Sequence, residues 1–220
     1  MRFVKIVFAT ASLAVASQAG AVMLTGGQTN VALDTEILSS VGLNLSGVSG
    51  PVIAPGNLGA ASVAFPITAA TTFDYTAGSL APFSGTIEHS GTVLFNDGGL
   101  EVGNFTIGYD AARESATTSG FFVADNVTFP GTALFDIGLP STLDATDMML
   151  TIGADLLVSP ELAGVLDDTG LIGVDVGDAL VEGTAGAVAV PEPGTLALML
   201  SGLALAGVAR RRRTSASTTA

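Results

Sequence analysis

The chain has 220 residues, of which 48% are apolar and 12% are charged, and it contains no cysteine. Seven basic side chains oppose 20 acidic ones, which gives a formal net charge of −13. Six of the basic residues lie near the termini, so residues 20–190 contain only Arg113 against 19 acidic residues, a net charge of −18. Such a body repels phosphate backbones, which excludes nucleic-acid binding. The lack of cysteine excludes disulfide bonds and thiolate metal sites.

The N-terminus has the layout of a secretory signal peptide. Arg2 and Lys5 supply a short positive region, and residues 6–15 form an apolar stretch that is followed by small residues. This order is typical of a segment that the export machinery recognises and removes. The small residue, any residue, alanine pattern is met at residues 17–19, so we expect a signal helix over residues 1–19 and cleavage after Ala19, with Ala21 as the second choice.

Residues 20–182 form the body and are predicted to be all-β. Short apolar runs alternate with clusters of Gly, Thr, Ser, Asn, Asp and Pro, and no stretch of 12 residues keeps a helical period. We expect an antiparallel β-sandwich with a jelly-roll-like arrangement. Residues 20–55 would hold a first strand with loose connections. The other expected strands are residues 62–67, 71–75, 85–88, 92–95, 100–109, 120–124, 132–139, 148–158 and 171–176.

The clearest turn lies between the strands predicted at residues 92–95 and 100–109. The pair Asp97 and Gly98 suits the positive backbone φ angles of a hairpin turn. In the second strand the alternation of apolar residues changes phase, which predicts a β-bulge at residues 103–104.

His89 is the only histidine, and Ser84, Glu88, Ser90 and Asp97 lie near it in sequence. A catalytic triad needs such groups to converge on an oxyanion hole, and the chain has no Gly-x-Ser-x-Gly segment. We therefore expect a solvent-facing turn histidine, assign no catalytic residue, and predict that the protein is not an enzyme.

Paired carboxylates could hydrolyse glycosides, but 19 acidic residues make some pair inevitable. The chain also has no tryptophan and only two tyrosines, Tyr75 and Tyr109, that could stack on sugars. A secreted carbohydrate-binding or glycoside-hydrolysing domain is therefore kept as the alternative function.

No cofactor is expected, and calcium is the one ion that the acidic side chains could hold, because it takes six to eight oxygen ligands. An EF-hand loop is absent. The default interpretation is a solvated acidic surface that keeps an exported protein soluble. The weak calcium candidates are Asp97, Glu101, Asp144, Asp147, Asp167 and Asp168.

The C-terminus begins with a predicted linker at residues 183–190, followed by Pro191, Glu192 and Pro193. Residues 194–209 are apolar and would form a helix of roughly 24 Å, a marginal span for a bilayer core of about 30 Å. Basic side chains at its end would extend to the membrane surface and stay cytoplasmic, and residues 214–220 form an expected disordered tail. These basic residues are Arg210, Arg211, Arg212 and Arg213.

The order of Pro191-Glu192-Pro193, an apolar helix and an arginine cluster at the C-terminus resembles the PEP-CTERM sorting signal of bacterial surface proteins, here spanning residues 191–213. The resemblance implies recognition by an exosortase, a membrane-embedded enzyme that would cleave near the motif. It also implies a membrane-anchored precursor that ends at the cell surface or outside the cell. Proteins with this tail resemble components of the exopolysaccharide matrix, so we expect a structural or interaction role in exopolysaccharide or biofilm.

Overall fold

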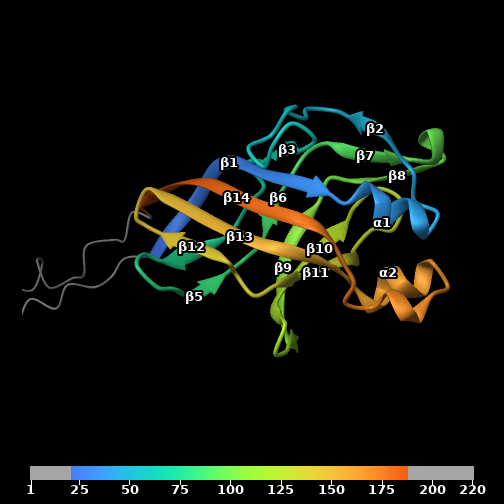
Figure 1. The fold of residues 1–220 in the computed structure, drawn as a ribbon. Coiled ribbons are helices and arrows are strands. Elements are labelled where there is room, and N and C mark those ends of the chain that lie inside the picture. Colours follow the sequence, from blue (N-terminus) through green and yellow to red (C-terminus); the bar gives the residue numbers. More distant parts are fainter. Residues whose placement is uncertain (1–20, 188–220) are drawn as a thin grey trace, which may run out of the picture.

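The computed structural model describes residues 21–187 (Figure 1). The predicted signal peptide with its cleavage site at Ala19, the sorting signal and the C-terminal tail lie outside these residues. Within residues 21–187, no helix has the length and apolar character needed to cross a membrane.

The body is antiparallel β-structure, as predicted, with two short α-helices. Its elements are β1 (Ala21–Leu33), α1 (Thr35–Ser40), β2 (Leu45–Ser49), β3 (Val63–Pro66), β4 (Asp74–Thr76), β5 (Leu80–Ser84), β6 (Ile87–Glu88), β7 (Thr92–Phe95), η1 (Asn96–Gly98), β8 (Leu100–Gly103), β9 (Thr106–Glu114), β10 (Thr118–Asp125), β11 (Thr132–Gly138), β12 (Thr142–Ala145), β13 (Met149–Val158), α2 (Pro160–Val165), η2 (Thr169–Leu171) and β14 (Asp175–Ala187).

The strands are divided unequally between two sheets, unlike the sheets of similar size that a jelly-roll-like sandwich would have. The large sheet has eleven strands, with β5-β4-β1-β14-β13-β11-β10-β9-β6 as its main order, and the small one has the order β2-β7-β8. The large sheet curls on itself. Many strands separate β5 from β9 in its order, yet Phe83 of β5 packs on Tyr109 of β9 with ring centroids 4.9 Å apart.

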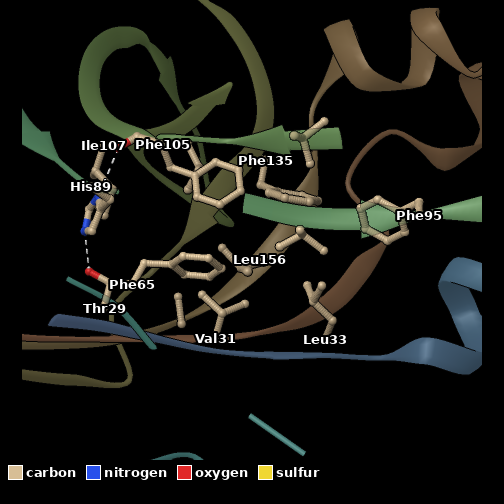
Figure 2. Close-up of a pocket in the computed structure, with 14 residues that line it drawn as sticks. Thr29, Val31, Leu33, Phe65, His89, Phe95, Phe105, Ile107, Phe135 and Leu156 are labelled. Carbon is tan, nitrogen blue, oxygen red and sulfur yellow. Dashed lines mark hydrogen bonds between the residues drawn. The ribbon is translucent and has the colours of Figure 1, made fainter. Parts of the chain in front are cut away.

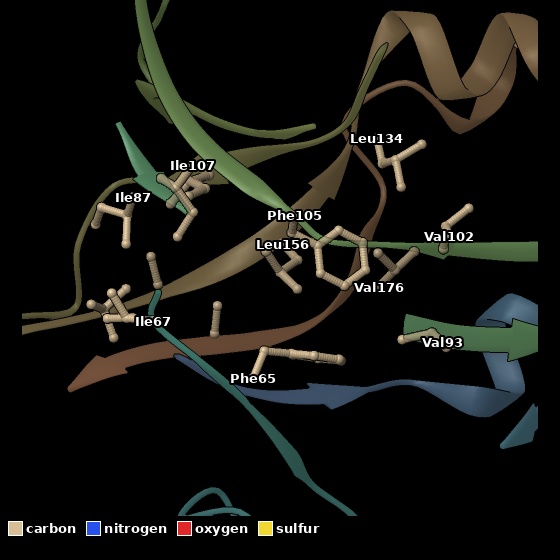
Figure 3. Packing of buried hydrophobic residues seen from close by; sticks show 14 of the residues in the cluster. Phe65, Ile67, Ile87, Val93, Val102, Phe105, Ile107, Leu134, Leu156 and Val176 are labelled. Atoms are coloured by element: carbon tan, nitrogen blue, oxygen red, sulfur yellow. The ribbon is translucent and has the colours of Figure 1, made fainter. Parts of the chain in front are cut away.

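The core fills the space between the curled sheet and the small sheet (Figure 3). Phe65 of β3 and Phe105, which precedes β9, meet edge to face with centroids 5.2 Å apart, a favoured geometry for aromatic pairs. On β13 the side chains of Leu150 and Leu156 are buried. This strand and β11 confirm the predicted positions to within one residue.

The hairpin at Asp97 and Gly98 is confirmed, since both residues have positive φ angles of 55° and 83°. The predicted bulge is wrong. Instead of one strand over residues 100–109, the chain leaves the small sheet after Gly103 and enters the large sheet at Thr106. Asn104, at φ 46°, makes this corner, and its amide donates to the Gly91 carbonyl.

Strand β14 corrects two predictions. The strand predicted at residues 171–176 begins only at Asp175, because residues 169–171 form a 3₁₀ turn. The linker predicted from residue 183 is in fact strand as far as Ala187, paired with β1 throughout. Gly183 in this segment has a packing role, because a Cβ there would lie 2.3 Å from the Leu24 side chain.

The two helices were not predicted, because each has only six residues and depends on local capping. In α1 the Asp34 carboxylate accepts from the amides of Glu36 and Ile37, and in α2 the Ser159 hydroxyl accepts from the Leu162 amide. Such N-caps satisfy amides that a helix leaves unpaired.

Candidate functional site

His89 lies in the protein core, so the prediction of a solvent-facing turn histidine is wrong. Only 6% of its surface is exposed. It follows β6, and its backbone forms an isolated β-bridge with Ile67. Its Nδ1 lies 3.0 Å from the Phe105 carbonyl oxygen and its Nε2 lies 2.7 Å from the Thr29 hydroxyl (Figure 2).

These two contacts fix the chemical state of the ring. A carbonyl oxygen can only accept, so Nδ1 carries the proton, and Nε2 then accepts a hydrogen bond from the Thr29 hydroxyl. Burial lowers the pKa of His89 to about 4, against smaller raising effects of the Phe105 carbonyl and Glu88. The ring is therefore neutral at physiological pH, and both of its nitrogens are used inside the fold.

The serines near His89 in sequence make other contacts. The Ser84 hydroxyl donates to the Asp74 carboxylate at 2.7 Å, and the Ser90 amide donates to the Pro66 carbonyl. His89 contacts Thr29 instead, a residue 60 positions away. The arrangement therefore supplies no serine for which His89 would act as general base.

An apolar cavity of about 50 Å³ adjoins His89 (Figure 2). The His89 ring lies at one end, with Phe95 and Leu33 toward the other. Pockets for drug-sized ligands and cofactors are usually about 300–1,000 Å³, so this space is a packing gap rather than a ligand site. Its lining comprises Thr29, Val31, Leu33, Phe65, His89, Val93, Phe95, Val102, Phe105, Ile107, Val123, Phe135, Leu156 and Ala179.

The calcium candidates lie in three separate regions of the fold. Asp97 lies in the β7–β8 turn, while the carboxylate of Glu101 on β8 accepts a hydrogen bond from Thr92. Asp144 lies on β12 and Asp147 in the turn that follows. Asp167 and Asp168 follow α2, where the Asp168 carboxylate accepts from the Gly170 amide. Among residues 21–187, no three acidic or histidine side chains are grouped in a way that could hold a metal ion.

Two carboxylates on the outer surface repel each other. Asp155 of β13 and Asp178 of β14 are directly opposite in register. Partial burial, followed by the charges of Asp155 and Asp175, raises the pKa of Asp178. Like charges that face each other across a strand pair destabilise the pairing.

Arg113 is the only basic residue of the body, and its guanidinium pairs with two carboxylates. Its guanidinium donates to Asp136 of β11 at 2.7 Å and to Glu161 of α2. The same group lies over the Phe122 ring, 5.0 Å from its centroid. Arg113 therefore ties the β9–β10 hairpin to the elements beside it.

An aromatic cluster lies where the curled sheet brings β5 close to β9 and β10. Phe83, Tyr109 and Phe121 pack together with centroid separations of 4.9 to 5.3 Å. Tyr109 is 38% exposed, and its hydroxyl donates to the Glu114 carboxylate. An exposed aromatic ring beside an acid, which sequence reasoning did not find, is thus present.

A second feature that sequence reasoning missed is an apolar rim at the end of the body where β1 begins and β14 ends. It consists of Met23, Met148 and Met149, all of which are exposed. The pair of methionines at the start of the strand predicted at residues 148–158 was the available signal.

The C-terminal segment of the chain is similar to a known family. Residues 189–213 match the family model described as the PEP-CTERM protein-sorting motif. The chain carries a PEP-CTERM sorting motif. This match contains Pro191, Glu192 and Pro193 and ends at Arg213. The motif implies a protein that is exported as a membrane-anchored precursor and sorted by an exosortase. It begins two residues after the end of β14.

Comparison of the body gives a structural neighbour. The crystal structure of the C-terminal domain of HtaA from Corynebacterium glutamicum is similar, with a TM-score of 0.46 and 16% sequence identity. The similarity covers 75% of this chain and 99% of that domain. No curated protein matches the sequence.

Proposed function

We propose that this protein is a non-enzymatic component of the cell surface or extracellular matrix, with a structural or interaction role in exopolysaccharide or biofilm. Its body is delivered by the sorting motif and acts as a rigid module. The observation that carries the proposal is that the match to the motif begins two residues after a central strand ends.

The attachment point of the motif supports this role. Strand β14 is paired on both sides, over residues 177–187 with β1 and over residues 175–184 with β13. Since the match to the motif begins at residue 189, almost no chain separates this strand from the sorting segment. A mechanical force on the C-terminal tail is therefore transmitted to the sheet through the backbone hydrogen bonds that β14 makes with β1 and with β13. Such an attachment suits a protein that is held at a surface.

The chemistry of the body also supports a non-enzymatic role. The only histidine is buried and neutral, with both nitrogens bonded to the protein. The only cation of the body is held by two carboxylates. Catalytic groups need access to substrate and a pKa suited to their task, and neither of these side chains provides both.

The sorting step can be tested by cell fractionation. Replacing Pro191, Glu192 and Pro193 together with alanine keeps the apolar segment, so we expect an unprocessed precursor in the membrane. Deleting the chain from Pro191 onward removes that segment too, and we expect the body in the medium. Ser215→Ala, which lies beyond the motif, serves as the control and should behave like the wild type. Unchanged location and size of the alanine variant would refute the role of the motif.

A second candidate function is carbohydrate binding, and the exposure of Tyr109 favours it. Aromatic faces beside carboxylates suit the stacking and hydrogen bonding of sugars, and Tyr109 adjoins Glu114. A polysaccharide pull-down with the wild type and Tyr109→Ala tests this candidate. Tyr75→Phe is the control, because Tyr75 is buried. Retention lost only in Tyr109→Ala supports binding, and a reducing-sugar assay on the bound fraction separates binding from hydrolysis.

A further inference from the structure

The apolar rim is unusually exposed for side chains of its kind. Met148 is 72% exposed, Met149 52% and Met23 40%. Single exposed apolar residues are ordinary, but a group of them on a soluble surface points to an interaction. Methionine suits an irregular or fluid partner because its side chain is flexible and polarizable.

The rim is built on ordered backbone. Met23 pairs with Gly186 of β14, and Met149 pairs with Thr184, so both project from the same outer face of the sheet. The turn before Met149 is fixed by the Thr146 hydroxyl, which accepts from the Met149 amide at 2.9 Å. The Tyr75 hydroxyl in turn donates to the Thr146 carbonyl at 2.7 Å.

The position of the rim identifies what it faces. In Figure 1, β12, the start of β1 and the end of β14 lie at one end of the body, and α2 lies at the other. The Ala185 amide donates to the Met148 carbonyl at 2.8 Å, so the rim borders the last residues of β14. From Ala187 to the apolar segment at Gly194 the chain can extend at most about 25 Å. A precursor held in the membrane by that segment therefore keeps the rim close to the lipid surface.

The charges around the rim select the kind of lipid. Asp144 and Asp147 are exposed beside it, and the only cation among residues 21–187, Arg113, is already paired with Asp136 and Glu161. Anionic headgroups would be repelled at low ionic strength. A zwitterionic surface has no net charge to repel the acidic body, and the methionine side chains can be buried at the boundary between its headgroups and acyl chains.

We propose that Met23, Met148 and Met149 form a docking surface for the zwitterionic lipid interface, which the precursor occupies before it is processed. Docking orients the end of β14 toward the bilayer and holds the motif at the membrane surface. This inference rests on the membrane-anchored precursor of the proposed function.

The lack of native cysteine allows a direct test with single-cysteine variants of the full-length precursor. Met148→Cys reports on the rim, and Val165→Cys is the control, because it is 46% exposed and lies beyond the other end of β13, roughly 30 Å away. Each variant is labelled with an environment-sensitive dye and reconstituted into phosphatidylcholine vesicles that contain a lipid-attached quencher. Flotation of the vesicles measures membrane attachment in the same sample.

We expect both variants to float with the vesicles, with a blue shift and loss of fluorescence for Met148→Cys only. Adding Met149→Asp to Met148→Cys should abolish the quenching without changing flotation, whereas Ile172→Asp in its place should leave the quenching intact. Anionic vesicles at low salt should quench less, and added salt should restore part of the loss.

Three results would overturn the proposal. If both variants float and neither is quenched, the rim does not dock, although the anchored precursor stands. If Met148→Cys shows a blue shift without lipid quenching, a second copy or another protein covers the rim. If the protein does not float, the membrane anchor fails, and the docking surface fails with it.

Discussion

Acidification should destabilise the body through His89. The unfolded chain protonates this histidine near pH 6.5, whereas burial lowers its pKa in the folded protein to about 4. Between these two pH values the unfolded state binds a proton that the native state does not, so the free energy of unfolding falls as the pH falls. The displacement of the pKa from 6.5 to about 4 corresponds to a loss of roughly 3 kcal/mol. The stabilisation is fully present above pH 6.5 and is exhausted below about pH 4.

Urea denaturation at a series of pH values from 7.5 to 4, on the wild type and on His89→Gln, measures this loss. Carboxylates also titrate in the lower part of this range, but they contribute to both proteins, so the difference in pH dependence isolates His89. Since the chain has one histidine, its ring C2–H resonance can also be followed by NMR without ambiguity. A resonance that titrates with a midpoint near 6.5, or equal pH dependence in the two proteins, would refute the reasoning.

Three further predictions concern stability and are checked by thermal or urea denaturation. Asp125→Ala should cost about 3 kcal/mol or more, because the buried carboxylate accepts from the amides of Gly103, Val127 and Phe129; a cost near zero would contradict this role. Gly27→Ala should destabilise far more than Gly131→Ala, since both have positive φ but only at Gly27 would a Cβ lie 2.2 Å from the Glu182 carbonyl oxygen; equal effects would exclude the clash. Asp178→Asn should raise stability by roughly 0.2–1 kcal/mol at pH 7 by removing like-charge repulsion. Because the pKa of Asp178 is raised in the folded protein, the wild type loses stability as the pH rises and the carboxylate ionises. The gain of the variant should therefore disappear at pH values below the ordinary Asp pKa, where Asp178 is protonated in both states. A gain that is independent of pH would count against repulsion.

Local patterns predicted those parts of the fold that local chemistry determines. The alternation of apolar residues was sufficient for β13, where Leu150, Ala154 and Leu156 face the core. The Asp97-Gly98 pair was sufficient for the turn between β7 and β8, because few residues tolerate its positive φ angles.

Features that depend on distant partners could not be predicted. The last part of β14 resembled a linker because it is rich in glycine. Gly183, however, leaves the space that the Leu24 side chain occupies, and Leu24 is 159 positions away in sequence. Polar neighbours in sequence suggested that His89 was exposed, yet its hydrogen-bond partners are Thr29 and the Phe105 carbonyl. The division of residues 100–109 between two sheets likewise depends on the corner at Asn104.

The functional features likewise include one that local sequence predicts and others that depend on distant strands. The sorting motif was predictable because an enzyme reads it as a short linear segment, and the match to residues 189–213 confirms it. The apolar rim and the exposed face of Tyr109 depend on which strands become neighbours, and a single sequence does not specify that.

We infer that the chain is exported and then processed at its C-terminal motif. The intact mass of the mature protein isolated from cells distinguishes this processing from an intact chain. We predict a mass that lacks residues 1–19 and also lacks residues that follow the Pro191-Glu192-Pro193 motif. A mature protein with the mass of all 220 residues, or one that retains the whole segment through Ala220, would contradict the account.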